Sequence, residues 1–173
     1  FLMIDTLLED YPGLSLITGA TSMRSFHESD KDLPRGAFRI NSSSVYYELY
    51  NTAMQVNPGS DVHFYHKSKL VPGVEKRIRA LPEFVSDRLI PDLGGTMTGY
   101  GTQDERTVFT HPGGAGLVAP VICYESVYGD FITEYIRNGA NLIVIITNDG
   151  WWKNTAGYRQ HLMFARIRAI ENR

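Results

Sequence analysis

The chain has little cysteine, no long hydrophobic run and no large excess of charge of either sign. Cys123 is the only cysteine in 173 residues, which excludes an intrachain disulfide. No run of about 18 apolar residues and no signal-peptide pattern occurs, so no segment of the chain is predicted to span a bilayer. The formal net charge of −2 gives no electrostatic signature for nucleic-acid binding. With 43% hydrophobic and 21% charged residues and no internal repeat, one globular domain over 1–173 is predicted.

Apolar runs alternate with helical patterns, which is typical of an α/β fold. The runs 116–124 and 141–147 are continuously apolar, as expected of central strands covered on both faces. Between them, hydrophobic residues recur at helical spacing over 126–138, and a glycine follows as a stop signal. A second helix is predicted over 157–173, with its apolar side chains packed on the sheet. The other predicted strands are 14–24, 46–56, 63–67 and 107–109.

Cys123 ends one of these apolar runs and is followed by the polar pair Tyr124-Glu125. An isolated cysteine in a strand more often packs as a small hydrophobic residue. This cysteine, however, falls at a predicted strand-to-helix junction, and open α/β sheets place their sites at the carboxyl ends of strands. A thiol held there can serve as a nucleophile with one fixed direction of attack.

Several motifs in a fixed order carry a resemblance to a known family. They are Tyr65-x-Lys67-x-x-Leu70-Val71-Pro72-x-x-Glu75, Cys123-Tyr124-Glu125, Asn148-Asp149-Gly150-Trp151 and Gln160-His161. The set resembles the nitrilase superfamily and, within it, the apolipoprotein N-acyltransferases, over nearly the whole chain. The resemblance implies a nitrilase-like α-β-β-α sandwich, present here as an incomplete catalytic domain.

The resemblance also implies roles for individual residues. Cys123 would be the nucleophile, and Lys67 would stabilise the oxyanion that develops on the substrate carbonyl, with the backbone N–H of Tyr124 as a second donor. Glu75 would orient Lys67. Lys69 shares a strand face with Lys67, and only the family spacing separates the two lysines.

Other motif positions are predicted to support the site or to bind substrate. Glu125 would support the loop that carries the nucleophile. Asn148, Asp149 and Trp151 follow the second apolar run, so they are expected at the same mouth as Cys123.

One member of the family's Glu-Lys-Cys triad has no counterpart in the sequence. The expected glutamate motif should precede the strand at 14–24, but the only acidic residues there are Asp5, Glu9 and Asp10, in a helix-to-turn pattern. None of these is assigned as the general base. The chain is therefore expected to be a piece of a longer protein and, because losing a general base costs about 10² to 10⁴ in rate, to be inactive or nearly so alone.

The leading functional prediction is an N-acyltransferase. Cys123 would take a fatty acyl group from a membrane phospholipid as a thioester and pass it to the N-terminal S-diacylglyceryl cysteine of an apolipoprotein. The resemblance places such an enzyme in the bacterial inner membrane, with its catalytic domain on the periplasmic side and its membrane helices outside this chain. The alternatives are a soluble amidase that acts on a small amide and a non-catalytic binding domain.

The histidines offer two further hypotheses. His161 would form a Cys-His dyad if it reached the thiol, although a lone histidine on a helix more often has a structural role. His63-x-x-His66 is a weak metal signal, because the two side chains of such a strand pair point to opposite faces. No metal and no cofactor are predicted.

Overall fold

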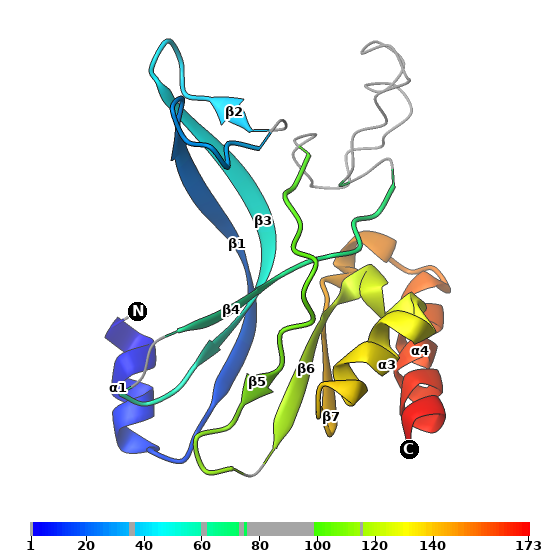
Figure 1. Ribbon diagram of the computed structural model, residues 1–173. Helices are drawn as coiled ribbons and strands as arrows, with labels where there is room; N and C mark the ends of the chain where they lie inside the picture. The colour runs from blue at the N-terminus through cyan, green and yellow to red at the C-terminus, as the bar shows by residue number, and fades with distance from the viewer. Residues whose placement is uncertain (1, 35–36, 60–61, 73–74, 76–98, 115) are drawn as a thin grey trace.

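Two β-sheets and the helices beside them make up the computed structural model (Figure 1), which describes residues 2–34, 37–59, 62–72, 75, 99–114 and 116–173. In chain order the elements are α1 (Leu2–Asp10), β1 (Leu16–His27), β2 (Phe38–Arg39), β3 (Val45–Val56), β4 (His63–His66), β5 (Phe109–Thr110), β6 (Leu117–Ile122), the 3₁₀ helix η1 (Cys123–Val127), α3 (Gly129–Arg137), β7 (Leu142–Ile146), the 3₁₀ helix η2 (Asp149–Trp152) and α4 (Gly157–Asn172). The predicted α/β class is confirmed, and each predicted strand has a counterpart.

The first sheet is antiparallel and is built on a long ribbon of β1 and β3. The two strands pair over twelve residues, from Leu16 opposite Val56 to His27 opposite Val45. The short strands β2 and β4 pair with β3 at different places along its length. Because β4 ends with His66 opposite Thr52, the next residue, Lys67, lies beside the middle of β3.

The second sheet has the order β5-β6-β7, and β6 and β7 run parallel. Their last residues, Ile122 and Ile146, are opposite each other, so the chain leaves both strands at the same edge of the sheet. β6 is buried almost throughout, as predicted for a central strand. β7 is only partly buried and lies at the edge of the described sheet, which differs from the prediction that both runs are central.

The two sheets pack face to face, with α3 and α4 on the outer side of the second sheet and α1 beside the first (Figure 1). Gly19 of β1 allows close approach, since a Cβ atom there would lie 2.8 Å from Cγ2 of Ile146 in β7. This layered arrangement is the predicted nitrilase-like α-β-β-α sandwich.

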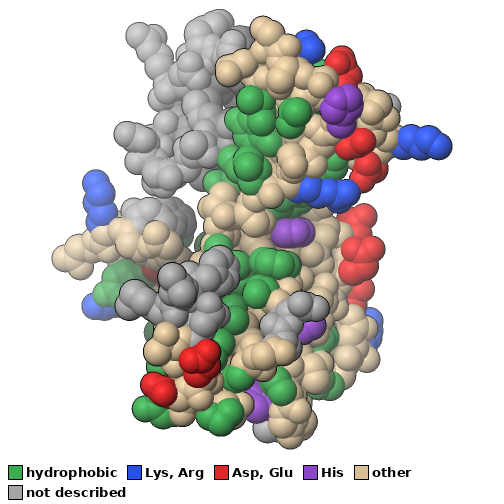
Figure 2. All heavy atoms as spheres, turned by 90° about the vertical axis from the view of Figure 1, so that its left-hand side faces the viewer, with side chains coloured by type: hydrophobic (Ala, Val, Ile, Leu, Met, Phe, Trp, Pro, Cys, Tyr) green, Lys and Arg blue, Asp and Glu red, His purple; other side chains and the backbone are tan. Residues whose placement is uncertain are grey.

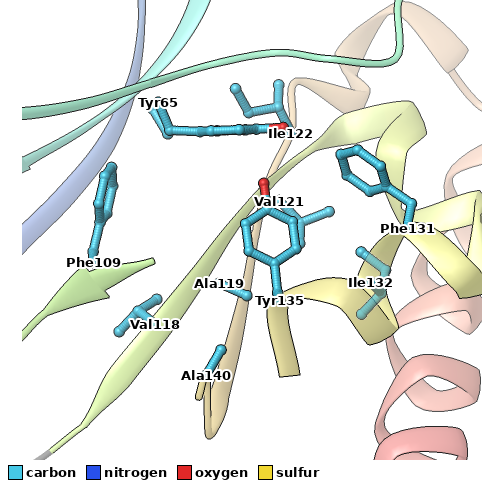
Figure 3. Close-up of a cluster of buried hydrophobic side chains, with 11 residues drawn as sticks. Tyr65, Phe109, Val118, Ala119, Val121, Ile122, Phe131, Ile132, Tyr135 and Ala140 are labelled. Carbon is cyan, nitrogen blue, oxygen red and sulfur yellow. The ribbon is translucent and has the colours of Figure 1, made fainter. Parts of the chain in front are cut away.

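The buried core joins side chains of β3, β4, β5, β6 and α3 (Figure 3). Tyr65 of β4 and Tyr135 of α3 are fully buried and meet edge to face, with ring centroids 5.8 Å apart. Aromatic pairs of this geometry contribute about 0.5–1.5 kcal/mol beyond the area they bury. The same tyrosine, Tyr65, precedes the candidate Lys67 by two residues, so the core fixes the strand that delivers the lysine.

The packing of α4 was predicted wrongly. Its apolar side chains do not cover the sheet, and four of them are exposed: Leu162, Met163, Ile167 and Ile170. α4 instead contacts α3 and η1 through a face that contains Arg168, which is buried and pairs with Glu171 at 3.1 Å. At its start Gly157 lies against the ring of Trp152, where any Cβ atom would clash. Helical spacing identified the helix but not the face it buries.

The side of the molecule on which α1 lies is shown in Figure 2. Acidic side chains gather along one edge of this face, and the Lys and Arg side chains on it are spread apart, in keeping with the net charge of −2. Among the described residues, no helix is both long enough and apolar enough to cross a membrane.

His66, on β4, is expected to make the stability of the fold depend on pH. Its Nδ1 lies 2.9 Å from Oγ1 of Thr52. The centroid of its ring lies 4.3 Å from that of the Tyr50 ring, and the two rings are tilted by 32°. Burial, and secondarily the charge of Arg24, lowers the pKa of His66. As the pH falls, His66 therefore binds a proton at a higher pH in the unfolded chain than in the folded chain. The free energy of unfolding should thus decrease as the pH falls below about 6.5, by at most about 1.4 kcal/mol per pH unit.

Urea unfolding of the wild type and of His66→Gln between pH 7.5 and pH 5 measures this contribution. The wild type should lose more stability over that interval than the variant. Equal losses in the two proteins would show that His66 does not carry the effect.

Candidate active site

Cys123 lies where β6 ends and η1 begins, and its backbone has a left-handed conformation with φ of +48°. For a residue other than glycine this conformation costs roughly 1–2 kcal/mol. The strand predicted over 116–124 accordingly ends at Ile122, and the helix predicted from residue 126 begins at Gly129 after the 3₁₀ turn. Cys123 itself is only partly buried. A partly exposed cysteine on a sharply turned backbone suits a nucleophile better than a packed core residue.

Glu125 is fully buried, and its carboxylate accepts four hydrogen bonds. Oε1 accepts from the hydroxyl of Tyr65 at 2.6 Å and from the backbone N–H groups of Ser68 at 2.6 Å and Lys69 at 3.2 Å. Oε2 accepts from the N–H of Ile122 at 2.8 Å. Burial raises the pKa of the Glu125 carboxyl, and these hydrogen bonds oppose that rise.

This single carboxylate connects the two segments that carry the candidate catalytic residues. Ser68, which it binds, directly follows Lys67, and Ile122, which it also binds, directly precedes Cys123. Glu125 therefore fixes the lysine segment against the nucleophile segment. These contacts are the basis on which a supporting role for Glu125 stays predicted.

Lys67 forms a buried ion pair with Glu75. Its Nζ lies 2.7 Å from both carboxylate oxygens of Glu75, and the lysine side chain is only 1% exposed. Glu75 is held in turn by the side-chain amide of Asn51 at 2.6 Å and by the backbone N–H of Val71 at 2.7 Å. A lysine is rarely buried so completely without a function or a partner, and the bidentate contact fixes the direction of its ammonium group.

The structure separates the two lysines that strand alternation left equivalent. Lys69 is exposed, and its Nζ lies 5.9 Å from the ring centroid of Tyr128 and 5.8 Å from that of Phe131. Glu75 pairs with Lys67, so Lys67 is the candidate for the site.

The chain that leaves β7 meets η1 through Asp149 and His161. Oδ1 of Asp149 accepts from Oγ1 of Thr147 at 3.0 Å and lies 2.9 Å from Nδ1 of His161. Nε2 of His161 lies 3.0 Å from the carbonyl oxygen of Cys123. Asp149 is thus connected to the segment of Cys123 through His161, which bridges α4 and η1.

The contacts of His161 do not match a Cys-His dyad. The described partners of its Nε2 are the carbonyl oxygen of Cys123 and Oγ of Ser126, at 3.0 and 3.2 Å. The ring therefore binds the backbone of the nucleophile, and the geometry favours a structural or positioning role over activation of the thiol.

Three other predicted site residues are Asn148, Tyr124 and Trp151. Asn148 is exposed, and its Oδ1 accepts from the N–H of Gly150 at 3.1 Å, which caps η2. The ring of Tyr124 packs edge to face on Tyr128, with centroids 5.2 Å apart. The backbone of Trp151 belongs to η2, and its side chain lies outside the described part of the structure.

Asn51 and Ser126 belong to the site but were not predicted from the sequence. Asn51 holds both ends of the ion pair, since its carbonyl oxygen accepts from the N–H of Lys67 at 2.8 Å while its side chain binds Glu75. Only the pairing of β3 with β4 brings it there, and nothing in its sequence neighbourhood signals that. Ser126 directly follows the Cys-Tyr-Glu motif, and this adjacency was an available signal.

The side chains of Glu9, Asp10, His63 and His66 take part in none of the contacts described above for Lys67 and Cys123. Glu9 and Asp10 are exposed on α1, which Figure 1 shows on the other side of the first sheet from η1. His63 is exposed on β4, whereas His66 binds Thr52. Within the described ranges, no cluster of three His, Cys, Asp or Glu side chains has a geometry that could hold a metal ion.

The chain is similar to the carbon-nitrogen hydrolase family and to several apolipoprotein N-acyltransferases. The family model for carbon-nitrogen hydrolases matches residues 37–173. The apolipoprotein N-acyltransferase of Chlorobaculum tepidum is 34% identical over 139 residues, covering 78% of this chain and 26% of that protein. The apolipoprotein N-acyltransferase of Agrobacterium fabrum is 32% identical over 170 residues, covering 97% of this chain and 28% of that protein.

The chain thus spans about a quarter of the length of these curated relatives. Among solved structures, Nit3 of Saccharomyces cerevisiae, described as a member of branch 10 of the nitrilase superfamily, aligns with a TM-score of 0.48 at 18% identity. That alignment covers 72% of this chain and 36% of the Nit3 chain.

Proposed function

The chain belongs to the carbon-nitrogen hydrolase family, and from this we propose that it forms part of the catalytic domain of an apolipoprotein N-acyltransferase. Its substrates would be a membrane phospholipid as acyl donor and an apolipoprotein with an N-terminal S-diacylglyceryl cysteine as acceptor. The named relatives support acyl transfer as the reaction class. The geometry around Cys123 supports a covalent mechanism.

In the first half-reaction, the thiolate of Cys123 attacks the ester carbonyl carbon of the phospholipid. The carbonyl oxygen becomes an oxyanion, which the ammonium group of Lys67 and the backbone N–H of Tyr124 stabilise. The C–O bond then breaks, and the departing lysophospholipid oxygen takes up a proton from the general base of the triad, which received that proton when the thiolate formed. The product is a thioester on Cys123.

In the second half-reaction, the neutral α-amine of the acceptor attacks the thioester carbonyl. The same two donors stabilise the second oxyanion, and the C–S bond breaks as the amide forms. The amine gives up a proton to a general base, and the thiolate of Cys123 is restored. The carboxylate of Glu75 holds Lys67 throughout, because it contacts the ammonium group through both oxygens.

The observation that carries this proposal is the carboxylate of Glu125, which binds both the segment after Lys67 and the segment before Cys123. It connects the segment of the buried Lys67 to the segment of the partly buried Cys123, and a rigid connection of this kind supports oxyanion stabilisation. The general base of the family's triad is assigned to no residue of this chain. We therefore expect the 173-residue chain alone to be inactive or nearly so, and the full-length protein to be held in the bacterial inner membrane by segments outside it.

The proposal is tested with the full-length protein in phospholipid vesicles and a synthetic S-diacylglyceryl peptide. Mass spectrometry should detect the N-acylated peptide with the wild type and none with Cys123→Ala. Release of ammonia from small amides without N-acylated peptide would instead support an amidase, which the family as a whole also suggests. Full function of Cys123→Ser would support a non-catalytic binding domain.

A further inference from the structure

The carbonyl group of Cys123 accepts hydrogen bonds from two side chains of different elements. Oγ of Ser126 donates to it at 2.8 Å, and Nε2 of His161 lies 3.0 Å from it. Ser126 is fully buried, and the His161 side chain is only 10% exposed. This carbonyl belongs to the same peptide group as the N–H of Tyr124, which is the second oxyanion donor of the proposed mechanism.

Both ring nitrogens of His161 lie within hydrogen-bond distance of an oxygen atom. The carbonyl oxygen of Cys123 can only accept, so Nε2 must donate to it. On the other side of the ring, Nδ1 lies 2.9 Å from Oδ1 of Asp149. The ring is therefore held by Asp149 and directed at the Cys123 carbonyl.

We propose that His161 is a positioning residue that acts, together with Ser126, through the Cys123–Tyr124 peptide. This inference rests on the proposed function, in which Cys123 is the nucleophile. Hydrogen bonds to the carbonyl oxygen polarise a peptide group and make its N–H a stronger donor, by about 10–30% per bond. The same two contacts hold the Cys123–Tyr124 peptide in the orientation that the left-handed backbone of Cys123 requires.

Two substitutions separate this role from a merely structural one. In His161→Gln, the side-chain amide nitrogen can take the place of Nε2 and still donate to the Cys123 carbonyl, while the contact with Asp149 is lost. In His161→Asn, the amide nitrogen can take the place of Nδ1 and still contact Asp149, while the donor to the carbonyl is lost. The proposal predicts that glutamine preserves acyl transfer better than asparagine.

The experiment measures the burst of p-nitrophenolate when the full-length protein is acylated by a p-nitrophenyl fatty ester. Removing an oxyanion donor costs about 10² to 10³ in kcat, so weakening one donor in His161→Asn should slow acylation about 10-fold. The ester concentration that gives half of the maximal burst rate should change little. His161→Gln should stay within about 3-fold of the wild type. Ser126→Ala removes the other donor on the same carbonyl and should slow acylation about 5-fold, so the test does not depend on the folding of one variant.

Alkylation of Cys123 by iodoacetamide provides the matched control, because this reaction uses the same thiol but forms no oxyanion. Its rate should change less than about 2-fold in all three variants. The proposal is overturned if glutamine impairs acylation more than asparagine does, or if alkylation slows in parallel with acylation, since His161 would then act on the thiol. Because the burst needs no phospholipid, a wild type that shows the burst but no transfer from phospholipid would contradict the proposed function alone.

Discussion

Glu75→Ala is expected to lower the free energy of unfolding by about 3–5 kcal/mol and to slow catalysis by about 10²-fold or more. The substitution leaves the ammonium group of Lys67, only 1% exposed, without the carboxylate that now contacts it through both oxygens. Asn51 and Val71 lose their acceptor at the same time. Urea unfolding and the N-acylation assay measure the two effects separately.

Adding Lys67→Met to Glu75→Ala distinguishes an unpaired charge from a general loss of packing. The double variant should be more stable than Glu75→Ala alone, by roughly 1–3 kcal/mol, because the buried charge has been removed. It should remain inactive, because the proposed mechanism needs the cation of Lys67 to stabilise the oxyanion. If the two substitutions destabilise additively, the ion pair does not have the energetic role assigned to it.

Glu125→Ala is expected to be among the most destabilising single substitutions in this domain, with a loss of about 4 kcal/mol or more. Four donors, from Tyr65, Ser68, Lys69 and Ile122, would lose their buried acceptor. Activity should fall further than stability alone explains, because the segments of Lys67 and Cys123 lose their common support. Calorimetric unfolding, with activity measured well below the transition, checks both expectations.

Glu125→Gln is the matched control for this prediction. Its amide oxygen can still accept from the lysine segment, whereas its NH₂ group faces the N–H of Ile122, which is itself a donor. Its loss of stability should therefore lie between zero and that of the alanine variant. Full stability and full activity in Glu125→Ala would contradict the supporting role.

The sequence predicted much of the fold because the relevant signals are local. Continuous apolar runs identified β6 and β7, and the glycine after residue 138 marked the end of α3. The packing of α4 was missed because the helical pattern does not show which neighbour a helix meets, and here Arg168 and Gly157 form the buried face. β6 ended earlier than predicted because the left-handed backbone of Cys123 turns the chain, and sequence periodicity carries no sign of that turn.

The candidate site was predicted in part, and the missing parts are tertiary. The family spacing singled out Lys67, Glu75 and Cys123, and the structure joins the first two directly and connects Lys67 with Cys123 through Glu125. Asn51 enters the site only through the pairing of β3 with β4. The bridge from Asp149 through His161 to the Cys123 carbonyl depends on how α4 packs against η1, which no local pattern specifies.

The covalent intermediate offers the most direct test of acyl transfer through Cys123. The full-length protein would be incubated with phospholipid vesicles without an acceptor and then analysed by intact mass and peptide mapping. We expect one acyl group on Cys123, absent in Cys123→Ala and lost when a diacylglyceryl peptide is added. Two results would contradict a thioester intermediate on Cys123. One is N-acylation of the peptide while Cys123 is never acylated, and the other is full activity of Cys123→Ala.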